Sequence, residues 1–203
     1  MTDYFALLGE ARRPWLDPEA LKAKFIALSA ETHPDHLQLP GATERMNANQ
    51  RFADLNSAFN CLRDPKTRLQ HLLELELGQK PGDLHQIPPD LASVFMDIAN
   101  LCRQTDDYLR QKEGTRSPLL RARLFEQGQK WSERLIARQR QVTRRQESLL
   151  AQLRALDEAW LKAEDNTPSK QILLDPLQEI WRLLSFLTRW SSQIQERLAR
   201  IAF

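Results

Sequence analysis

The sequence predicts an all-α protein, and three observations support this fold class. Glycine occurs only six times in 203 residues, Val and Thr are scarce, and the helix-favouring residues Leu, Ala, Gln, Glu and Arg are abundant. Hydrophobic residues recur every three or four positions along most of the chain, as they do on one face of a helix. Prolines that follow Asp or Ser mark the beginnings of several of these stretches.

Residues 1–78 are expected to form a first domain of four helices. The apolar stretch 4–8, which Gly9 closes, predicts a short first helix. The second helix begins at Asp17-Pro18, because an N-cap acceptor there precedes a proline whose missing N–H costs nothing at the first helical position. Its buried stripe comprises Leu21, Phe25 and Leu28.

The third helix is predicted over residues 43–62, after a turn around Pro40-Gly41. The fourth begins at Asp64-Pro65, which repeats the start signal of the second, and ends at Gly78. The third helix is expected to place five apolar residues near one face: Met46, Phe52, Leu55, Phe59 and Leu62.

Residues 79–89 have the proline and glycine content of a linker, and residues 90–203 are expected to form a second domain. Apolar stripes in this domain predict an antiparallel bundle of three helices. The first is capped by Asp90 and ends at Gly114, the second runs from Ser117-Pro118 to Trp160 as one long helix or two abutting ones, and the third begins at Asp175-Pro176.

The tripeptide His33-Pro34-Asp35 lies where the second predicted helix must end. Pro34 fixes its own φ, lacks an N–H and disfavours the helical region for the residue before it. We therefore expect a corner that presents an imidazole and a carboxylate on either side of a rigid residue. Such a corner offers two polar side chains to the surface of another molecule.

Residues 3–75 resemble a J-domain, both in the order of the helices and in the position of His33-Pro34-Asp35 between the second and third. A proline-marked linker before a carboxy-terminal three-helix bundle is typical of one J-domain family. Two segments are similar to this family, the HscB (Jac-type) co-chaperones of iron–sulfur cluster assembly: Asp3-Tyr4-Phe5-x-Leu7-x-Gly9 and Leu62-Arg63-Asp64-Pro65-x-x-Arg68-x-x-x-Leu72-Leu73-x-Leu75.

The resemblance implies a co-chaperone that has no catalytic residues of its own. A J-domain docks on the ATPase part of a DnaK-type chaperone, and His33, Pro34 and Asp35 would trigger ATP hydrolysis by that partner. Basic residues steer such docking through complementary charge, which raises the association rate. The residues that match this expectation are Lys22, Lys24, Arg45 and Arg51.

The resemblance also implies a client, the iron–sulfur cluster scaffold protein, which the bundle of this family binds on an apolar patch with acidic companions. Asn100 and Arg103 stand where acids are expected, which leaves only Asp106 and Asp107 nearby. The residues that match the apolar patch are Phe95, Met96 and Ala99 on the first bundle helix and Phe186 on the last.

Between Arg110 and Arg154 the chain has 12 basic and 4 acidic residues, a net charge of +8. Such a stretch is either a solvated helix face or a surface for an anionic partner. The second reading defines an alternative function, a J-like interaction protein whose basic bundle binds an anionic partner such as nucleic acid. Because no aromatic residues interleave with Arg138–Arg145, as stacking on single strands requires, nucleic acid is not the expected partner.

The sequence gives no support to an enzyme, a cofactor or a metal site. No nucleophile motif or glycine-rich phosphate loop occurs, and His33 and His36 lack the i, i+4 spacing of a helical zinc site. Cys61 and Cys102 are far apart and are expected to be reduced thiols. With a formal net charge of +2 and no leader pattern, we expect a cytoplasmic protein without a membrane partner, as a monomer or weak dimer.

Overall fold

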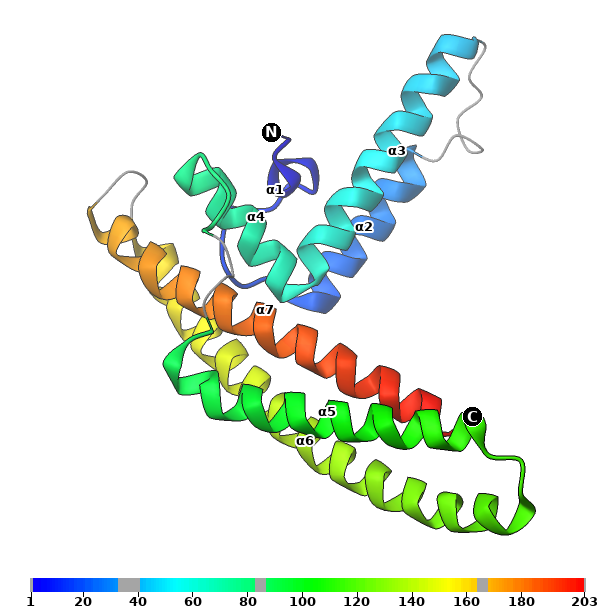
Figure 1. The fold of residues 1–203 in the computed structure, drawn as a ribbon. Coiled ribbons are helices and arrows are strands. Elements are labelled where there is room, and N and C mark those ends of the chain that lie inside the picture. The colour runs from blue at the N-terminus through cyan, green and yellow to red at the C-terminus, as the bar shows by residue number, and fades with distance from the viewer. Residues whose placement is uncertain (1, 33–40, 83–86, 164–167, 203) are drawn as a thin grey trace. The chain divides into compact units, whose positions relative to one another are not determined.

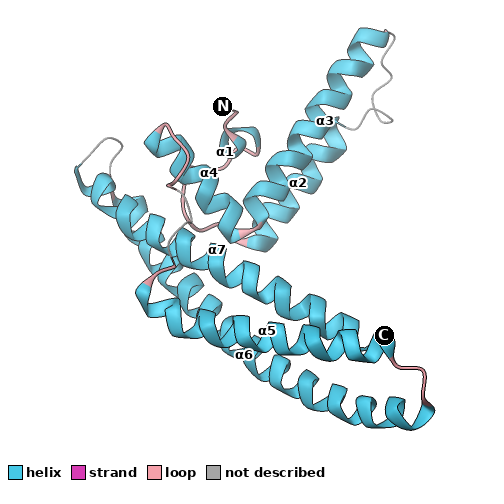
Figure 2. Ribbon diagram, in the orientation of Figure 1, coloured by secondary structure: helices cyan, strands magenta, loops and turns pink. Residues whose placement is uncertain are grey.

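The structure is a computed structural model that describes residues 2–32, 41–82, 87–163 and 168–202. Every regular element among these residues is a helix, so the predicted all-α class is confirmed (Figures 1 and 2). In chain order the helices are α1 (Tyr4–Leu7), α2 (Pro18–Thr32), α3 (Ala42–Arg63), α4 (Pro65–Leu77), α5 (Pro89–Gly114), α6 (Pro118–Lys162) and α7 (Pro168–Ala202).

The chain divides into two compact units. Unit 1 contains Met1–Gly82 and Leu150–Trp181, and unit 2 contains Asp83–Leu149 and Arg182–Phe203. Unit 1 therefore includes α1 to α4 together with the last part of α6 and the first part of α7. The division of the sequence into residues 1–78, 79–89 and 90–203 stays a prediction.

Within unit 1, α2 and α4 begin where the sequence indicated, and α4 ends at the predicted glycine. Asp17 Oδ1 accepts a hydrogen bond from the backbone N–H of Ala20 at 2.8 Å, and Asp64 Oδ1 accepts one from Thr67 at the same distance. These carboxylates satisfy N–H groups that a helix start leaves without an intrahelical partner. Gly78 ends α4 with φ of +69°, a left-handed conformation that few other residues adopt without strain.

The core of unit 1 is formed by leucines and two aromatic pairs. Phe25 of α2 stacks on Phe59 of α3 with ring centroids 4.2 Å apart, which joins these two helices. His71 of α4 stacks on Tyr4 and accepts a hydrogen bond from its backbone N–H at 3.1 Å. The fully buried aliphatic side chains around them include Leu8, Leu21, Leu62, Leu69, Leu72 and Leu73.

A polar cluster within unit 1 joins the α1–α2 connection to α6. The guanidinium of Arg13 pairs with the buried carboxylate of Asp157, which also accepts a hydrogen bond from the backbone N–H of Trp15 at 3.0 Å. The indole N–H of Trp160 donates to the carbonyl of Arg12 at 2.8 Å. These bonds satisfy polar groups that burial would otherwise leave unpaired.

Arg68 is a second buried cation of unit 1. Its guanidinium donates to the carbonyl oxygens of Pro14 and Leu62, at 2.9 and 2.8 Å, and lies 5.6 Å from the ring of Trp15. Burial lowers the pKa of Arg68 to about 10, so the side chain is still charged near neutral pH. It fixes the α1–α2 connection against α4.

Unit 2 consists of α5, the first part of α6 and the last part of α7. The phenol of Tyr108 donates a hydrogen bond to the carbonyl of Leu124 at 2.9 Å, which joins α5 to α6. Gly128 passes so close to this phenol that a Cβ there would lie 2.5 Å from Tyr108 Oη. Leu109 is buried in the same cluster, and Ile201 of α7 packs against it.

Two details of the prediction are wrong. The last helix begins at Pro168, not at Asp175-Pro176, so Pro176 lies inside α7. An internal proline removes one helical hydrogen bond, but Leu174 and Leu177 on either side of it are buried and hold the helix together. The first bundle helix begins at Pro89 with Pro88 as its N-cap, so Asp90 is not the cap. Met46, one of the five apolar residues predicted near one face of α3, is exposed.

Candidate functional site

The predicted trigger residues His33, Pro34 and Asp35 lie outside the described residues. The two helices on either side of the tripeptide are described: α2 ends at Thr32 and α3 begins at Ala42. Near its end α2 is bonded internally, because Thr32 Oγ1 donates to the carbonyl of Leu28 at 2.8 Å. At the start of α3, Glu44 accepts a hydrogen bond from the backbone N–H of Gly41 at 3.2 Å.

The basic residues predicted beside the tripeptide differ in their contacts. Lys24 donates to the carbonyl of Gly9 at 2.6 Å and pairs with Glu10 at 2.8 Å, so its charge holds the α1–α2 connection. Lys22 on α2 and Arg51 on α3 are exposed. Arg45 is also exposed and takes part in a further contact within the protein. Lys22 and Arg51 are therefore better placed than Lys24 to attract a negatively charged partner.

The predicted client patch lies on α5, in unit 2. Met96 retains 57% of its exposed area, and Ala99 is also exposed. Phe95 is half-buried, with its ring 6.0 Å from the ring of Trp190 on α7. Met96, Ala99 and the accessible part of Phe95 thus form a small apolar surface on α5.

Phe186 has a different place from the one expected for a client-binding side chain. Only 5% of its area is exposed, and its ring lies 6.0 Å from the ring of Trp190. Trp190, itself buried, lies next to both Phe186 and Phe95. Phe186 therefore supports the patch from beneath through Trp190 and offers little surface to a partner.

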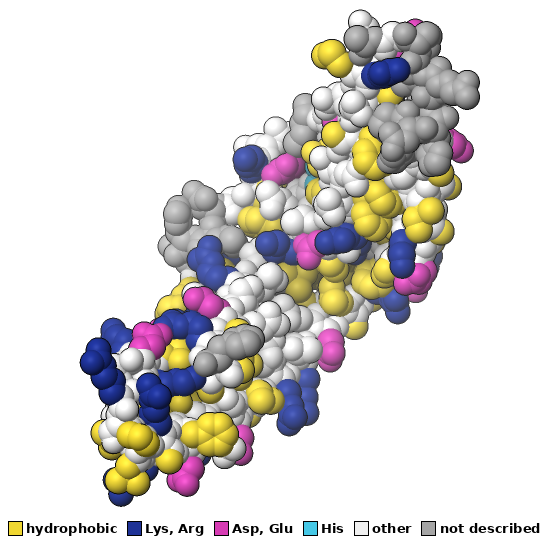
Figure 3. All heavy atoms as spheres, turned by 90° about the vertical axis from the view of Figure 1, so that its right-hand side faces the viewer, with side chains coloured by type: hydrophobic (Ala, Val, Ile, Leu, Met, Phe, Trp, Pro, Cys, Tyr) yellow, Lys and Arg dark blue, Asp and Glu magenta, His cyan; other side chains and the backbone are white. Residues whose placement is uncertain are grey.

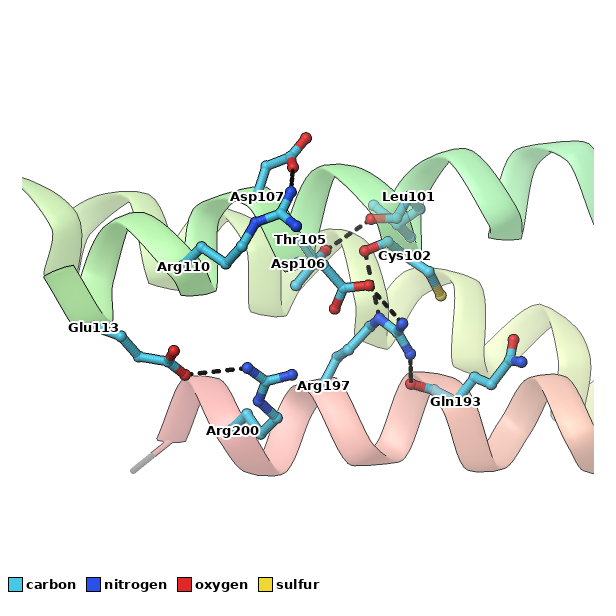
Figure 4. Close-up of polar contacts among 10 residues, drawn as sticks. All are labelled: Leu101, Cys102, Thr105, Asp106, Asp107, Arg110, Glu113, Gln193, Arg197 and Arg200. Carbon is cyan, nitrogen blue, oxygen red and sulfur yellow. Dashed lines mark hydrogen bonds and ion pairs between the residues drawn. The ribbon is translucent and has the colours of Figure 1, made fainter.

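The two acidic residues near the patch are paired with arginines inside unit 2. Asp106 accepts a hydrogen bond from Arg197 of α7 at 2.6 Å, and Asp107 pairs with Arg110 one turn later on α5 (Figure 4). Arg197 also donates to the carbonyl of Gln193 at 2.9 Å. Asp106 and Asp107 thus serve contacts within the bundle, which reduces the negative charge they present to a partner.

The pKa of Arg197 reflects its pairing with Asp106. Burial acts to lower the pKa of Arg197, but the hydrogen bond to Asp106 and the nearby acidic groups outweigh it, so the pKa is raised. The charged form of Arg197 is therefore favoured. A second pair between the same helices, Arg200 with Glu113 at 3.1 Å, is more exposed and contributes less (Figure 4).

Several arginines of the basic stretch Arg110–Arg154 make contacts within the protein. In unit 2, Arg138 pairs with Asp97 at 3.1 Å, and Arg134 lies 4.4 Å from the ring of Trp131. In unit 1, Arg154 lies 4.3 Å from the ring of Trp15. Part of the stretch thus stabilises the fold, whereas Arg121, Arg123, Arg140 and Arg144 are exposed.

The described residues show no constellation for metal binding or nucleophilic chemistry. No group of three or more His, Cys, Asp or Glu side chains among them is arranged to hold a metal ion. Burial raises the pKa of Cys61 to about 11 and also raises that of Cys102, so both thiols stay protonated near neutral pH. Within the described part of the chain, no helix is long and apolar enough to cross a bilayer.

Comparison with solved structures identifies the fold. The chaperone HscB from Vibrio cholerae superposes with a TM-score of 0.61 over 96% of both chains, at 22% sequence identity. This chain has the HscB fold. The human co-chaperone protein HscB matches with a TM-score of 0.56 over 97% of this chain and 82% of that chain, at 17% identity. No protein-family model matches the sequence.

The HscB fold confirms the predicted architecture, an N-terminal four-helix J-domain followed by a C-terminal three-helix bundle. In chain order the first four helices are α1 to α4, and the last three are α5, α6 and α7. Because α2 and α3 are the second and third helices of the J-domain, the His33-Pro34-Asp35 sequence falls between the expected pair. Sequence reasoning did not predict that the polar side chains of Asp157 and Arg68 are buried in unit 1.

Proposed function

We propose that this protein is a co-chaperone that stimulates ATP hydrolysis by a DnaK-type chaperone. One observation carries the proposal: the sequence His33-Pro34-Asp35 connects α2 and α3 in a chain with the HscB fold. The protein supplies no nucleotide site in this proposal. Its contribution is to bind the ATPase part of the partner and favour the arrangement in which ATP is hydrolysed.

The rigid pairing of α2 with α3 supports this function. The stacked rings of Phe25 and Phe59 fix the spacing of the two helices, and Leu55 and Leu62 are buried nearby in the sequence of α3. Two helices whose spacing is already fixed lose less conformational freedom on docking than helices that must first be brought together. Lys22 and Arg51, exposed on α2 and α3, would then accelerate association with an acidic surface.

We propose further that unit 2 binds the client, which is the iron–sulfur cluster scaffold protein. Met96, Ala99 and the accessible part of Phe95 provide an apolar contact on α5, and Trp190 and Phe186 support it from within. Apolar anchors of this kind contribute most of the binding energy of many interfaces. Since Asp106 and Asp107 are paired with arginines, the apolar residues would contribute the larger share of the binding energy here.

The test of the first proposal is single-turnover ATP hydrolysis by the cognate DnaK-type chaperone, with and without the purified protein. Wild-type protein should raise the hydrolysis rate, and His33→Gln should abolish this effect. His85→Gln, the same substitution in the predicted linker, is the matched control and should stimulate like wild type. Full stimulation by His33→Gln, with its circular dichroism spectrum unchanged, would refute the proposal.

A further inference from the structure

One end of unit 2 carries an open groove of about 1210 Å³ between the last turns of α5, the first part of α6 and the end of α7. Leu109, Leu124 and Ile201 line it, although Leu109 and Leu124 are almost fully buried. Phe125 and Ile136 lie at the same groove and retain 69% and 41% of their exposed areas. Large apolar side chains this exposed, lining one hollow, are typical of interaction sites.

The groove has a fixed shape. Tyr108 is anchored to the carbonyl of Leu124, and Gly128 leaves room for its phenol. On the other side, Lys112 Nζ donates to the carbonyl of Ile201 at 3.0 Å, which ties the end of α7 to α5. Binding to a site that such bonds have already formed costs less conformational entropy than binding to a site that must be assembled.

The concave surface continues along α6 beyond the groove. A second hollow, of about 330 Å³, begins at the same Ile136 and reaches Glu147, with Arg140 and Arg144 in its wall. From Arg121 to Glu147 the helix rises by about 40 Å at 1.5 Å per residue. The combined surface is therefore long and narrow, with exposed apolar residues at one end and arginines toward the other.

The charge around this surface is positive. The side chains that line the two hollows include five basic ones, Lys112, Arg121, Arg140, Arg144 and Arg200, and three acidic ones, Glu113, Glu133 and Glu147. Among the groove residues, Lys112 and Arg121 donate to main-chain carbonyls, and neither has a carboxylate partner among the described residues. Glu113 is paired with Arg200, which leaves Glu133 as the acidic side chain opposing them.

We propose that this groove binds an amphipathic helix of a partner protein, whose apolar face contacts Phe125 and Ile136 and whose acidic flanks contact the basic residues of α6. The inference goes beyond the proposed function, because the groove residues are different from those of the client patch on α5. An amphipathic helix matches the length, the apolar lining and the charge of the surface together. Figure 3 shows hydrophobic side chains among Lys and Arg side chains at the lower end, the region of the α5–α6 connection in Figure 1.

Two other partners fit these features less well. A peripheral membrane site presents a convex apolar surface that inserts into the bilayer, whereas Phe125 and Ile136 line a hollow. Nucleic acid binding requires cations that follow a phosphate backbone, and a single exposed aromatic ring, that of Phe125, offers no series of stacking positions for successive bases. Both partners are therefore alternatives that the experiment must distinguish from a helix.

The test uses a fluorescently labelled, designed 18-residue helical peptide with leucines at i, i+4, i+7 and i+11 and glutamates on both flanks, titrated with the full-length protein. Wild-type protein should bind it more weakly as salt rises, because part of the attraction is electrostatic. Phe125→Ala should weaken binding by about tenfold, as expected for loss of an anchor side chain. Leu119→Ala, at a residue that is 70% exposed and outside the groove, is the control and should bind like wild type.

Charge is tested separately on the same helix. Arg121→Glu should weaken binding by about fivefold at low salt, whereas Arg123→Glu, an exposed residue outside the groove lining, should have a smaller effect. A peptide with lysines in place of the glutamates should bind more weakly than the acidic peptide. Circular dichroism of each variant verifies that the helices are intact.

Four results would overturn the proposal: no binding of the acidic peptide, equal binding of the lysine peptide, equal losses in Phe125→Ala and Leu119→Ala, or tighter binding of anionic lipid vesicles or an oligonucleotide than of the peptide. The last result would assign the basic surface to a membrane or to nucleic acid. No chaperone is present in these assays, so failure of the proposed ATPase stimulation would leave their outcome unchanged.

Discussion

Arg13 and Asp157 form an ion pair within unit 1, and the side chain of Asp157 retains only 4% of its exposed area. The same carboxylate accepts the backbone N–H of Trp15. Removing one partner of a buried pair leaves the other charge without compensation, which costs more than the pair itself contributes. The α1–α2 connection therefore depends on an acidic residue that lies more than 140 positions away in the sequence.

We predict that Asp157→Ala lowers the free energy of unfolding by about 2 kcal/mol, because it removes the hydrogen bonds to Arg13, whose side chain is 31% exposed and is still solvated, and leaves the N–H of Trp15 unpaired. Asp157→Asn should cost less, since its amide oxygen still accepts the hydrogen bond from Trp15. Urea unfolding followed by circular dichroism measures both. Glu158→Ala, at the exposed neighbouring position, is the control, and a loss equal to that of Asp157→Ala would contradict the prediction.

Gly128 and Tyr108 give a second prediction. Gly128→Ala would place a Cβ 2.5 Å from Tyr108 Oη, so Tyr108 must move and lose its bond to Leu124. We expect a loss of about 1–3 kcal/mol from overpacking, reduced by the better helix propensity of alanine. Removing the hydroxyl in Tyr108→Phe should relieve this strain, so the double variant should be more stable than the sum of the single effects predicts.

His71 makes the stability of unit 1 depend on pH. Burial lowers its pKa from the ordinary 6.5, although Asp3 and Glu74 oppose this effect and Arg12 adds to it. The unfolded chain then binds a proton at a higher pH than the folded one, so stability is full above pH 6.5 and falls as the pH drops toward the folded pKa. Urea midpoints at pH 7.5 and 5.5 should differ less in His71→Gln than in wild type, and an equal difference would refute this role.

The client patch predicts a binding effect that is separable from folding. Met96 is exposed, so Met96→Ala should leave the unfolding midpoint nearly unchanged but weaken binding of the iron–sulfur scaffold protein by about tenfold. Phe95→Ala should lower both the unfolding midpoint and the affinity for the scaffold protein, because Phe95 also packs near Trp190. Isothermal titration calorimetry measures the affinity, with Leu119→Ala as the control. Unchanged affinity in Met96→Ala would remove this residue from the interface.

Helix starts were predictable from the sequence where a local signal decided them. Asp17-Pro18 and Asp64-Pro65 each combine an acceptor with a proline, and both carboxylates cap their helices in the structure. The same signal failed at Asp175-Pro176, because buried Leu174 lies before the proline and tertiary packing extends the helix through it. A local rule cannot include contacts made with distant segments.

The polar contacts in the core were not predictable in the same way. Asp157 and Arg68 are charged residues in helical sequences, where most such residues are solvated. Their burial depends on Arg13, Trp15 and Pro14, which come from a different part of the chain. Likewise, the pairing of Asp106 with Arg197 depends on how two helices of unit 2 approach each other, which the sequence pattern of one helix does not contain.

The two thiols have a practical consequence for studying this protein. Only a thiolate reacts rapidly with alkylating labels, and a thiol with a pKa of about 11, as at Cys61, is almost entirely protonated at pH 7.5. Cys102 is buried, with a pKa also raised. A cysteine introduced at an exposed position, such as Leu119 or Met96, should therefore accept a spectroscopic probe selectively while both natural cysteines stay in place.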